Sequence, residues 1–143
     1  MAQNAELYLT YCSRRKRKAP GLLPARARYL SARIRAVEKL AEHAGVAFRI
    51  FSGRYGLIAP TRRIPWYDHL LLPGEVSAMA KKLAPQLRGR ARVTFWYAPD
   101  DYLAPYRAAL RQAASRAGVR WRQLPWAPAK ARCRGASRLR SGR

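Results

Sequence analysis

The stretch Val46-Ala-Phe-Arg-Ile-Phe-Ser-Gly-Arg-Tyr-Gly-Leu57 joins a short apolar run to a turn that contains two glycines. The run 46–51 is rich in aromatic and β-branched residues, which predicts a buried strand. A segment with helical spacing precedes it and ends at Gly45. Its apolar residues are Leu30, Ile34, Val37 and Ala41. A helix followed by a strand and a polar turn is one unit of an α/β architecture.

The same alternation extends in both directions along the chain. Further strands are predicted at Leu7–Cys12, Val93–Ala98 and Val119–Leu124, with helices between them over 76–87 and 103–117. We therefore expect a single-domain three-layer α/β sandwich with a four-stranded, mostly parallel sheet, a βαβαβαβ pattern, and strand order 2-1-3-4 by analogy with flavodoxin-like folds. The last strand alternates polar and apolar residues, which favours an edge position.

Length and composition bound the organisation of the chain. Its 143 residues are too few for two full domains, and a hydrophobic content of 49% is enough for a folded core. We assign residues 1–126 to the α/β domain and residues 127–143 to a basic flexible tail, because the tail lacks apolar periodicity.

The charge is strongly basic. Thirty Lys and Arg residues against seven Asp and Glu give a formal net charge of +23. A polyanion relieves this self-repulsion, so DNA or RNA is the expected partner; a generally Arg-rich composition is the alternative reading. No apolar stretch is long enough to span a bilayer, and two distant cysteines, Cys12 and Cys133, indicate a reducing, cytoplasmic setting. No metal cluster and no cofactor motif is recognised.

Polar residues follow three of the predicted strands, at 12–18, 52–57 and 99–101. Because ligands bind outside the carboxyl ends of the strands in open parallel sheets, these segments are expected to share one edge and form the site. The few acidic residues in loops argue against a two-metal nuclease.

Two features of these segments could carry chemistry. Gly53 and Gly56 could let backbone N–H groups converge on an anion, or could simply form a tight turn. Cys12 lies among cations that would activate a thiol, or it is a small buried side chain beside a phosphate-facing loop.

Aromatic residues occur near the same loops and could stack bases or belong to the core; they are Trp66, Tyr67, Trp96, Tyr97, Tyr102 and Tyr106.

Two segments carry a resemblance to known families. The segment Phe51-Ser-Gly-Arg-Tyr-Gly-Leu-Ile-Ala-Pro60, continuing to Ile64 and Tyr67, resembles the Ser-Gly-x-Tyr-Gly-Leu-Leu-x-Pro-x-x-x-Ile-x-x-Tyr signature of the YaaA peroxide-stress proteins. The front half resembles a related group of small domains with Cys-Ser-x-x-Lys, then Pro-Ala, then Tyr-x-Ser. The matching residues here are Cys12, Ser13, Lys16, Pro24, Ala25, Tyr29 and Ser31. A similar Cys-x-x-x-Lys element occurs in the archaeosine synthase domain, which acts on a deazaguanine base in transfer RNA.

The resemblance implies DNA binding in the first case and base-modifying chemistry in the second. This chain is shorter than the YaaA proteins, and Thr61-Arg62-Arg63 replaces an acidic residue that often follows the motif proline. That replacement weakens the transfer of catalytic roles and favours phosphate contact. Three functions are therefore expected as alternatives: a nucleic-acid-binding protein, an enzyme that modifies a nucleobase or nucleoside, or a basic component of a ribonucleoprotein.

The candidate residues fall into three sets. Candidate catalytic residues are Cys12, Lys16, Ser52, Tyr55 and Tyr67. Candidate nucleic-acid contacts are Arg14, Arg15, Lys16, Arg17, Lys18, Arg54, Arg62, Arg63, Arg132 and Arg134. Further candidate pocket residues are Ser13, Tyr29, Ser31, Gly53, Gly56 and Asp100.

Overall fold

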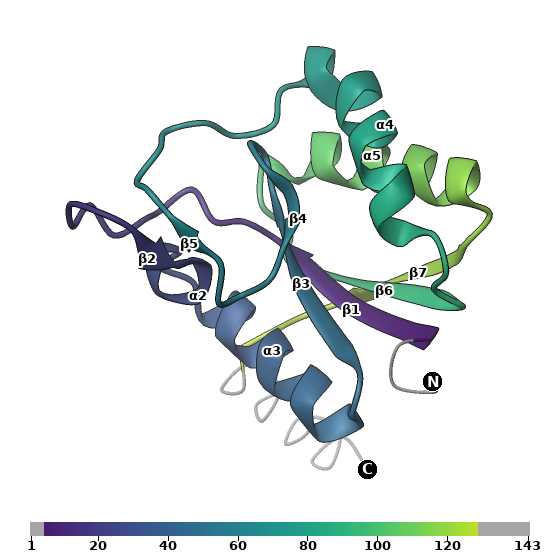
Figure 1. Cartoon of the computed structure of the whole chain (residues 1–143), viewed down its shortest axis with the longest axis horizontal. Coiled ribbons are helices and arrows are strands. Elements are labelled where there is room, and N and C mark those ends of the chain that lie inside the picture. Colours follow the sequence, from purple (N-terminus) through teal and green to yellow (C-terminus); the bar gives the residue numbers. More distant parts are fainter. Residues whose placement is uncertain (1–4, 129–143) are drawn as a thin grey trace, which may run out of the picture.

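Five strands form the central sheet of the computed structural model, which describes residues 5–128 (Figure 1). They are β1 (Glu6–Tyr11), β3 (Ala47–Ser52), β4 (Gly56–Ile58), β6 (Arg92–Tyr97) and β7 (Arg120–Pro125). The spatial order is β4-β3-β1-β6-β7. The pairs β3–β1, β1–β6 and β6–β7 are parallel, and β4 runs antiparallel to β3.

Helices cover both faces of this sheet. Figure 1 shows α3 (Ala32–Ala44) on one side and α4 (Val76–Leu87) and α5 (Leu103–Ala117) together on the other. A short 3-10 helix, η1 (Pro73–Glu75), leads into α4. Two very short strands, β2 (Leu23–Pro24) and β5 (Arg63–Ile64), form a separate antiparallel pair beside α2 (Ala25–Arg28). This small unit lies beyond the carboxyl end of β1 (Figure 1).

Local sequence explains the main boundaries. The Ser31 hydroxyl accepts a hydrogen bond from the N–H of Ile34 at 3.2 Å and begins α3. Gly45 and Gly118 end α3 and α5 with left-handed φ angles of 68° and 67°, as their positions in the sequence predict. The central strand β1 is buried on both faces, which is typical of a parallel strand between helical layers.

The α/β class and the mostly parallel sheet are confirmed, but the predicted count of four strands is wrong. The three-residue strand β4 follows the glycine turn directly and extends the sheet beyond β3, so the full strand order differs from the predicted four-strand order. A three-residue strand is too short to produce an alternating pattern that sequence analysis can recognise. The last strand, β7, lies at an edge of the sheet as expected.

Two further predictions concern the C-terminal tail and membrane-spanning segments. The tail expected over 127–143 falls almost entirely outside the described residues, so its boundary stays a prediction. In the part of the chain that the structure describes, no helix has the length and apolar character needed to cross a membrane.

Candidate nucleic-acid interface

The segment after β1 is held in place by a buried arginine. Arg28 in α2 is fully buried, and its guanidinium donates hydrogen bonds to the carbonyls of Arg17, Ala19, Gly21 and Ile64 at 2.7–3.3 Å. The backbone of this segment also pairs with the end of α2, at Lys16 and Tyr29. Carbonyl dipoles thus solvate the Arg28 charge. The same hydrogen bonds fix the path of the segment after β1, which we call the basic loop.

The segment after β3 is closed by Ser52. Its hydroxyl accepts hydrogen bonds from the N–H groups of Arg54 and Tyr55, both at 3.1 Å. The N–H of Leu57 donates to Gln86 Oε1 in α4 at 3.0 Å. These three donors are therefore occupied within the protein, which favours the tight-turn alternative over convergence of the N–H groups on an anion.

The two glycines of this turn are explained by packing and backbone conformation. A Cβ at Gly53 would lie 2.6 Å from the Tyr106 hydroxyl and 2.8 Å from the Leu71 nitrogen. Gly56 has a φ of +79°, and a Cβ there would lie 2.9 Å from Gln86 Oε1. Gly53 is required by close approach and Gly56 by its left-handed conformation.

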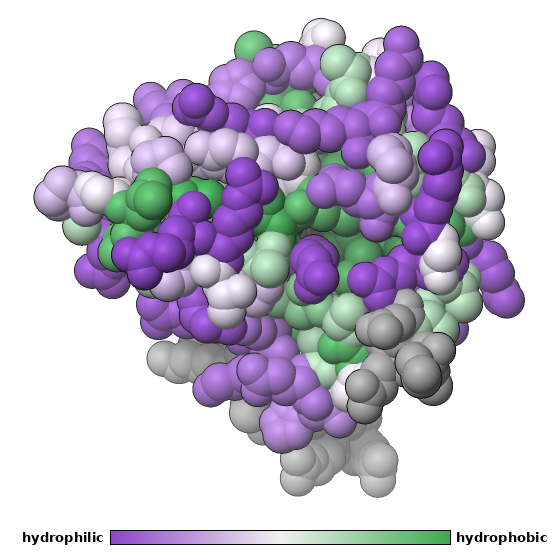
Figure 2. All heavy atoms as spheres, viewed as in Figure 1, coloured by the Kyte–Doolittle hydropathy of each residue, from purple (hydrophilic) through white to green (hydrophobic). Residues whose placement is uncertain are grey.

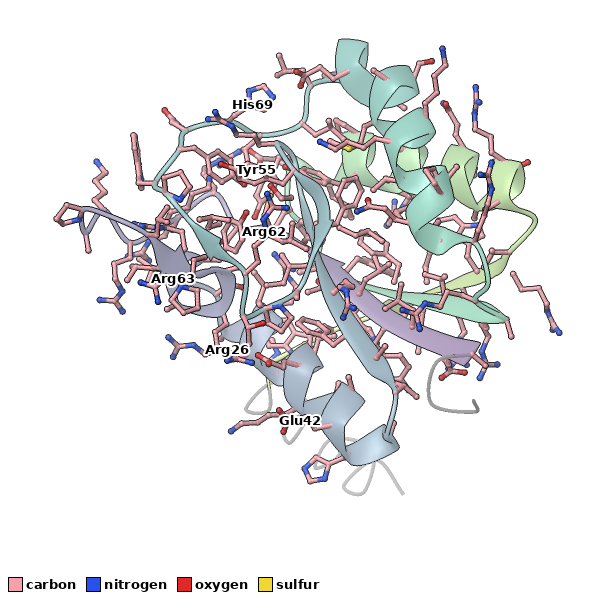
Figure 3. All side chains as sticks on the ribbon, in the orientation of Figure 1. Arg26, Glu42, Tyr55, Arg62, Arg63 and His69 are labelled. Carbon is pink, nitrogen blue, oxygen red and sulfur yellow. The ribbon has the colours of Figure 1, made fainter. Side chains whose placement is uncertain are left out.

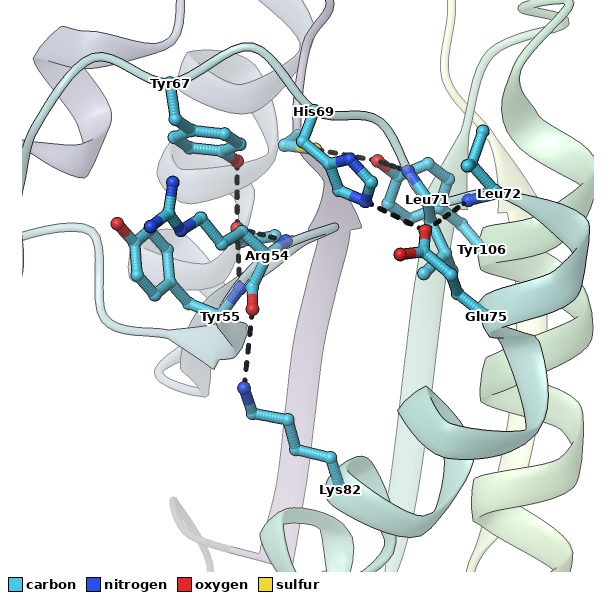
Figure 4. Close-up of polar contacts among 11 residues, drawn as sticks. Arg54, Tyr55, Tyr67, His69, Leu71, Leu72, Glu75, Lys82 and Tyr106 are labelled. Carbon is cyan, nitrogen blue, oxygen red and sulfur yellow. Dashed lines mark hydrogen bonds and ion pairs between the residues drawn. The ribbon is translucent and has the colours of Figure 1, made fainter.

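A buried network of hydroxyl groups joins the two motif segments, and Figure 4 shows the part of it around Tyr67 and Tyr106. The Tyr67 hydroxyl lies 2.6 Å from the Tyr29 hydroxyl and 2.9 Å from Ser52 Oγ. Cys12 Sγ lies 3.1 Å from the Tyr106 hydroxyl, which accepts a hydrogen bond from the Leu71 N–H at 3.0 Å. The predicted convergence of the segment after β1 with the segment after β3 is confirmed, and the Cys12 N–H bonds directly to the Phe51 carbonyl at 2.8 Å.

Burial keeps the phenols of this network neutral. Desolvation raises the pKa of Tyr29, Tyr67 and Tyr106 well above the usual range, and a negative charge on the nearby Cys12 would raise these pKa values further. Cys12 and Ser52 each have an exposed fraction of 0%. A ligand cannot reach either side chain in this conformation, so the geometry favours the interpretation of Cys12 as a packed side chain over a catalytic one.

Lys16 differs from its neighbours because it reaches this network from the outside. Its exposed fraction is 7%, and its ammonium lies 4.7 Å from the centre of the Tyr67 ring and 6.0 Å from that of Tyr29. Burial lowers the pKa of Lys16, and negative charges on Cys12 and Asp68 oppose that shift. Within residues 5–128, no hydrogen-bond acceptor or carboxylate pairs with this ammonium.

Two adjoining cavities lie at this edge of the sheet and share Arg14, Arg15 and Leu30. The first, of about 360 Å³, is lined by the shared residues and by Lys16, Lys18, Trp66, Tyr67 and Asp68. The second, of about 420 Å³, is lined by the shared residues and by Ser13, Ser31, Ala32, Arg33, Ala98, Asp100, Tyr102 and Trp126. The pocket candidates Ser13, Ser31 and Asp100 therefore do line this cavity. Gly53 lines a different cavity of about 310 Å³ beside α4, and Tyr29 and Gly56 are packed beneath the surface.

Cations and aromatic rings alternate over the first cavity and the surface beside it. Lys18 lies 5.7 Å from the Trp66 ring, and Arg54 and Arg62 lie 5.5 and 4.9 Å from the Tyr55 ring. We call this surface the basic–aromatic rim. Its residues are Lys16, Lys18, Arg54, Tyr55, Arg62, Trp66 and Tyr67. Figure 3 places Tyr55, Arg62 and Arg63 on the same side of the molecule, and Figure 2 shows many hydrophilic side chains over this face.

Most cations at this edge of the sheet form no ion pair with a described carboxylate. Among the described residues, the four cations of the rim make no ion pair with a carboxylate, and the same holds for Arg15, Arg17 and Arg63. Arg14 differs, because it pairs with Asp101 at 2.8 Å. Arg63 donates to the Leu22 carbonyl at 3.1 Å. Arg132 and Arg134, also predicted as contacts, lie outside the described residues.

Comparison with known proteins places the chain in one family. The model of a family of unknown function, DUF6884, matches residues 7–131. The chain belongs to DUF6884. The matched residues include both motif segments and all the described strands apart from Glu6 at the start of β1, so the family spans nearly the whole described fold and not only the site. A search of curated proteins and a search of solved structures each found no match. The resemblance to the YaaA and archaeosine synthase families stays a prediction.

Two buried arginines of this DUF6884 domain were not predicted from the sequence. Arg28 and Arg33 are both buried, and Arg33 donates to Thr10 Oγ1 at 2.5 Å and to the Tyr11 carbonyl at 2.6 Å. No local pattern distinguishes a buried arginine from the many exposed ones in so basic a sequence.

Among residues 5–128, no group of His, Cys, Asp and Glu residues has an arrangement that could hold a metal ion.

The segment between β5 and α4 makes polar contacts of its own with the start of α4. His69 Nε2 lies 2.8 Å from Glu75 Oε1, which also accepts the Leu72 N–H at 2.8 Å (Figure 4). The Leu72 N–H, followed by the interaction with His69, lowers the pKa of Glu75. These contacts tie His69 and Leu72 to the start of α4, and the contact of the Tyr67 hydroxyl with Ser52 Oγ joins the same segment to β3.

Proposed function

We propose that this DUF6884 protein binds nucleic acid through the basic–aromatic rim, with largely electrostatic contacts to phosphates. The observation that carries the proposal is the set of rim cations that lie against aromatic faces and have no carboxylate partner within residues 5–128. Unpaired cations at a surface are available to polyanion phosphates, and the neighbouring rings offer faces on which bases can stack.

The overall charge supports the same proposal. A formal net charge of +23 favours association with any polyanion and makes that association sensitive to salt. The rim adds a specific location, because its cations come from three chain segments that the fold brings together. The two adjoining cavities, of about 360 and 420 Å³, lie beside this surface and offer space for an unstacked base.

The location is tested by two matched triple variants. Lys18→Gln/Arg54→Gln/Arg62→Gln removes three charges from the rim, and Lys81→Gln/Arg111→Gln/Arg116→Gln removes three exposed charges from α4 and α5. Affinities for one single-stranded and one duplex oligonucleotide are measured by fluorescence anisotropy. We expect the rim variant to lose about tenfold or more relative to the α4–α5 variant, because direct phosphate contacts exceed long-range charge effects. Equal losses in the two variants would remove the rim from the proposal.

A further inference from the structure

The Lys16 side chain is largely buried, and its ammonium makes no ion pair within residues 5–128. Its exposed fraction is 7%, and its contacts within residues 5–128 are the faces of Tyr67 and Tyr29, at 4.7 and 6.0 Å. Taking an ammonium out of water is costly unless an acceptor or an opposite charge replaces the lost hydration. Two aromatic faces replace it only in part. An anionic ligand at this position would supply the missing partner.

The space in front of Lys16 is suited to the end of a chain. The cavity of about 360 Å³ has buried Lys16 and Tyr67 at its inner side, and exposed Arg14, Lys18 and Trp66 around its mouth. An internal phosphodiester continues in two directions and carries one negative charge, so it matches a site lined by four cations less well than a more highly charged group does. A terminal phosphate monoester continues in one direction and carries nearly two negative charges at neutral pH.

The other charged groups at the cavity favour an anion. Four cations line it, Arg14, Arg15, Lys16 and Lys18, against the single carboxylate of Asp68. Asp68 is exposed to solvent, where its repulsion of an anion is screened. Of the exposed cations that line this cavity, Arg14 forms an ion pair with Asp101. The other two, Arg15 and Lys18, form no ion pair with a described residue.

We propose that this cavity binds the terminal phosphate of a nucleic-acid strand, with the Lys16 ammonium donating hydrogen bonds to the phosphate oxygens. The exposed ring of Trp66, 43% accessible, lies at the mouth where the terminal base would stack. This inference rests on the proposed function, since the rim holds the rest of the strand. It adds a preference for strand ends that phosphate contacts along the rim do not provide.

The test measures the affinity of the native protein for three forms of one oligonucleotide. The first form carries a 5′-phosphate, the second a 3′-phosphate, and the third has hydroxyl groups at both ends. A hydroxyl-ended oligonucleotide that is one nucleotide longer controls for added charge. We expect at least one phosphorylated form to bind about tenfold or more tightly than both hydroxyl-ended forms, as a charge-assisted hydrogen bond implies. Lys16→Gln should abolish this preference, because the phosphorylated and hydroxyl-ended forms then bind equally, whereas Lys39→Gln on exposed α3 should retain it.

The outcomes separate this inference from the proposed function. Equal binding of phosphorylated and longer hydroxyl-ended forms would overturn the terminal site while leaving the rim intact. Failure of every form to bind would overturn the proposed function itself. If a folded Lys16→Gln variant still prefers the phosphorylated form, the preference comes from another group and the role of Lys16 is overturned. The comparison of oligonucleotides needs only the native protein, so it decides the matter even if the variant does not fold.

Discussion

Cys12 and Tyr106 lie 94 positions apart in the sequence, yet the Cys12 thiol is 3.1 Å from the Tyr106 hydroxyl. This contact joins the end of β1 to α5 beneath the candidate interface. Both side chains have an exposed fraction of 0%. Cys12, which the sequence leaves open as either an activated thiol or a small buried side chain, is therefore part of the internal framework at this edge of the sheet.

Burial predicts that the Cys12 thiol is inert in the native protein. In a Cys133→Ser background, we expect Cys12 to react with a soluble disulfide reagent at least about a hundredfold more slowly in buffer than in denaturant, because reaction requires opening of the fold. The measurement is thiol modification followed by absorbance. Rapid stoichiometric reaction of the folded protein would show that the site opens readily and would restore the thiol as a candidate nucleophile.

Gly53 is predicted to be intolerant of a methyl group. Gly53→Ala should lower the free energy of unfolding by about 1–3 kcal/mol, because its Cβ would collide with the Tyr106 hydroxyl and the Leu71 nitrogen. Gly74→Ala is the control, since a Cβ there meets nothing within 4 Å. Urea denaturation of both variants checks the difference, and equal stabilities would mean that the turn relaxes without cost.

Arg28 is predicted to be essential for the shape of the basic loop. Arg28→Met should lower the free energy of unfolding by about 3 kcal/mol or more, because it leaves four carbonyl groups without their donor. Arg26→Met on the same short helix removes a partly exposed pair with Glu38 and should cost at most about 1 kcal/mol. Comparable losses in the two variants, measured by thermal and denaturant unfolding, would contradict the framework role.

The buried tyrosines predict a loss of stability at alkaline pH. Desolvation raises the pKa of Tyr29, Tyr67 and Tyr106 in the folded state, so the native protein retains protons that the unfolded chain releases. The free energy of unfolding should therefore fall as the pH rises through about 10, the usual tyrosine pKa. Ultraviolet titration should show these phenols ionising only with unfolding. Ionisation of every tyrosine near pH 10 in a protein that stays folded would disprove their burial.

Sequence patterns predict the large elements of this domain well, for identifiable reasons. Apolar runs such as Val93–Ala98 mark the parallel strands, and Gly45 and Gly118 mark the helix ends because only glycine adopts the left-handed conformation easily. The meeting of the Cys12 and Ser52 segments also follows from topology, since neighbouring parallel strands end at one edge. The short strand β4 has too few residues to show a periodicity.

The finer features of the site depend on contacts between distant residues. The glycine turn offers no free N–H cradle because Ser52 accepts two of its donors and Gln86, 29 residues from Leu57, accepts another. The burial of Arg28 depends on carbonyls from residues 17–21 and from Ile64. Neither arrangement has a local signature, so sequence reasoning identifies the segments but not the role of each side chain.

The salt dependence of nucleic-acid affinity tests the central claim most directly. If the protein neutralises six or more phosphates, its affinity should fall by about 10³ or more between about 50 and 200 mM salt. The rim variant Lys18→Gln/Arg54→Gln/Arg62→Gln should show a slope of log affinity against log salt that is shallower by about 2 to 3 than that of the native protein. A flat response of the native protein, or an unchanged slope in the rim variant, would contradict the assignment of this surface to phosphate binding.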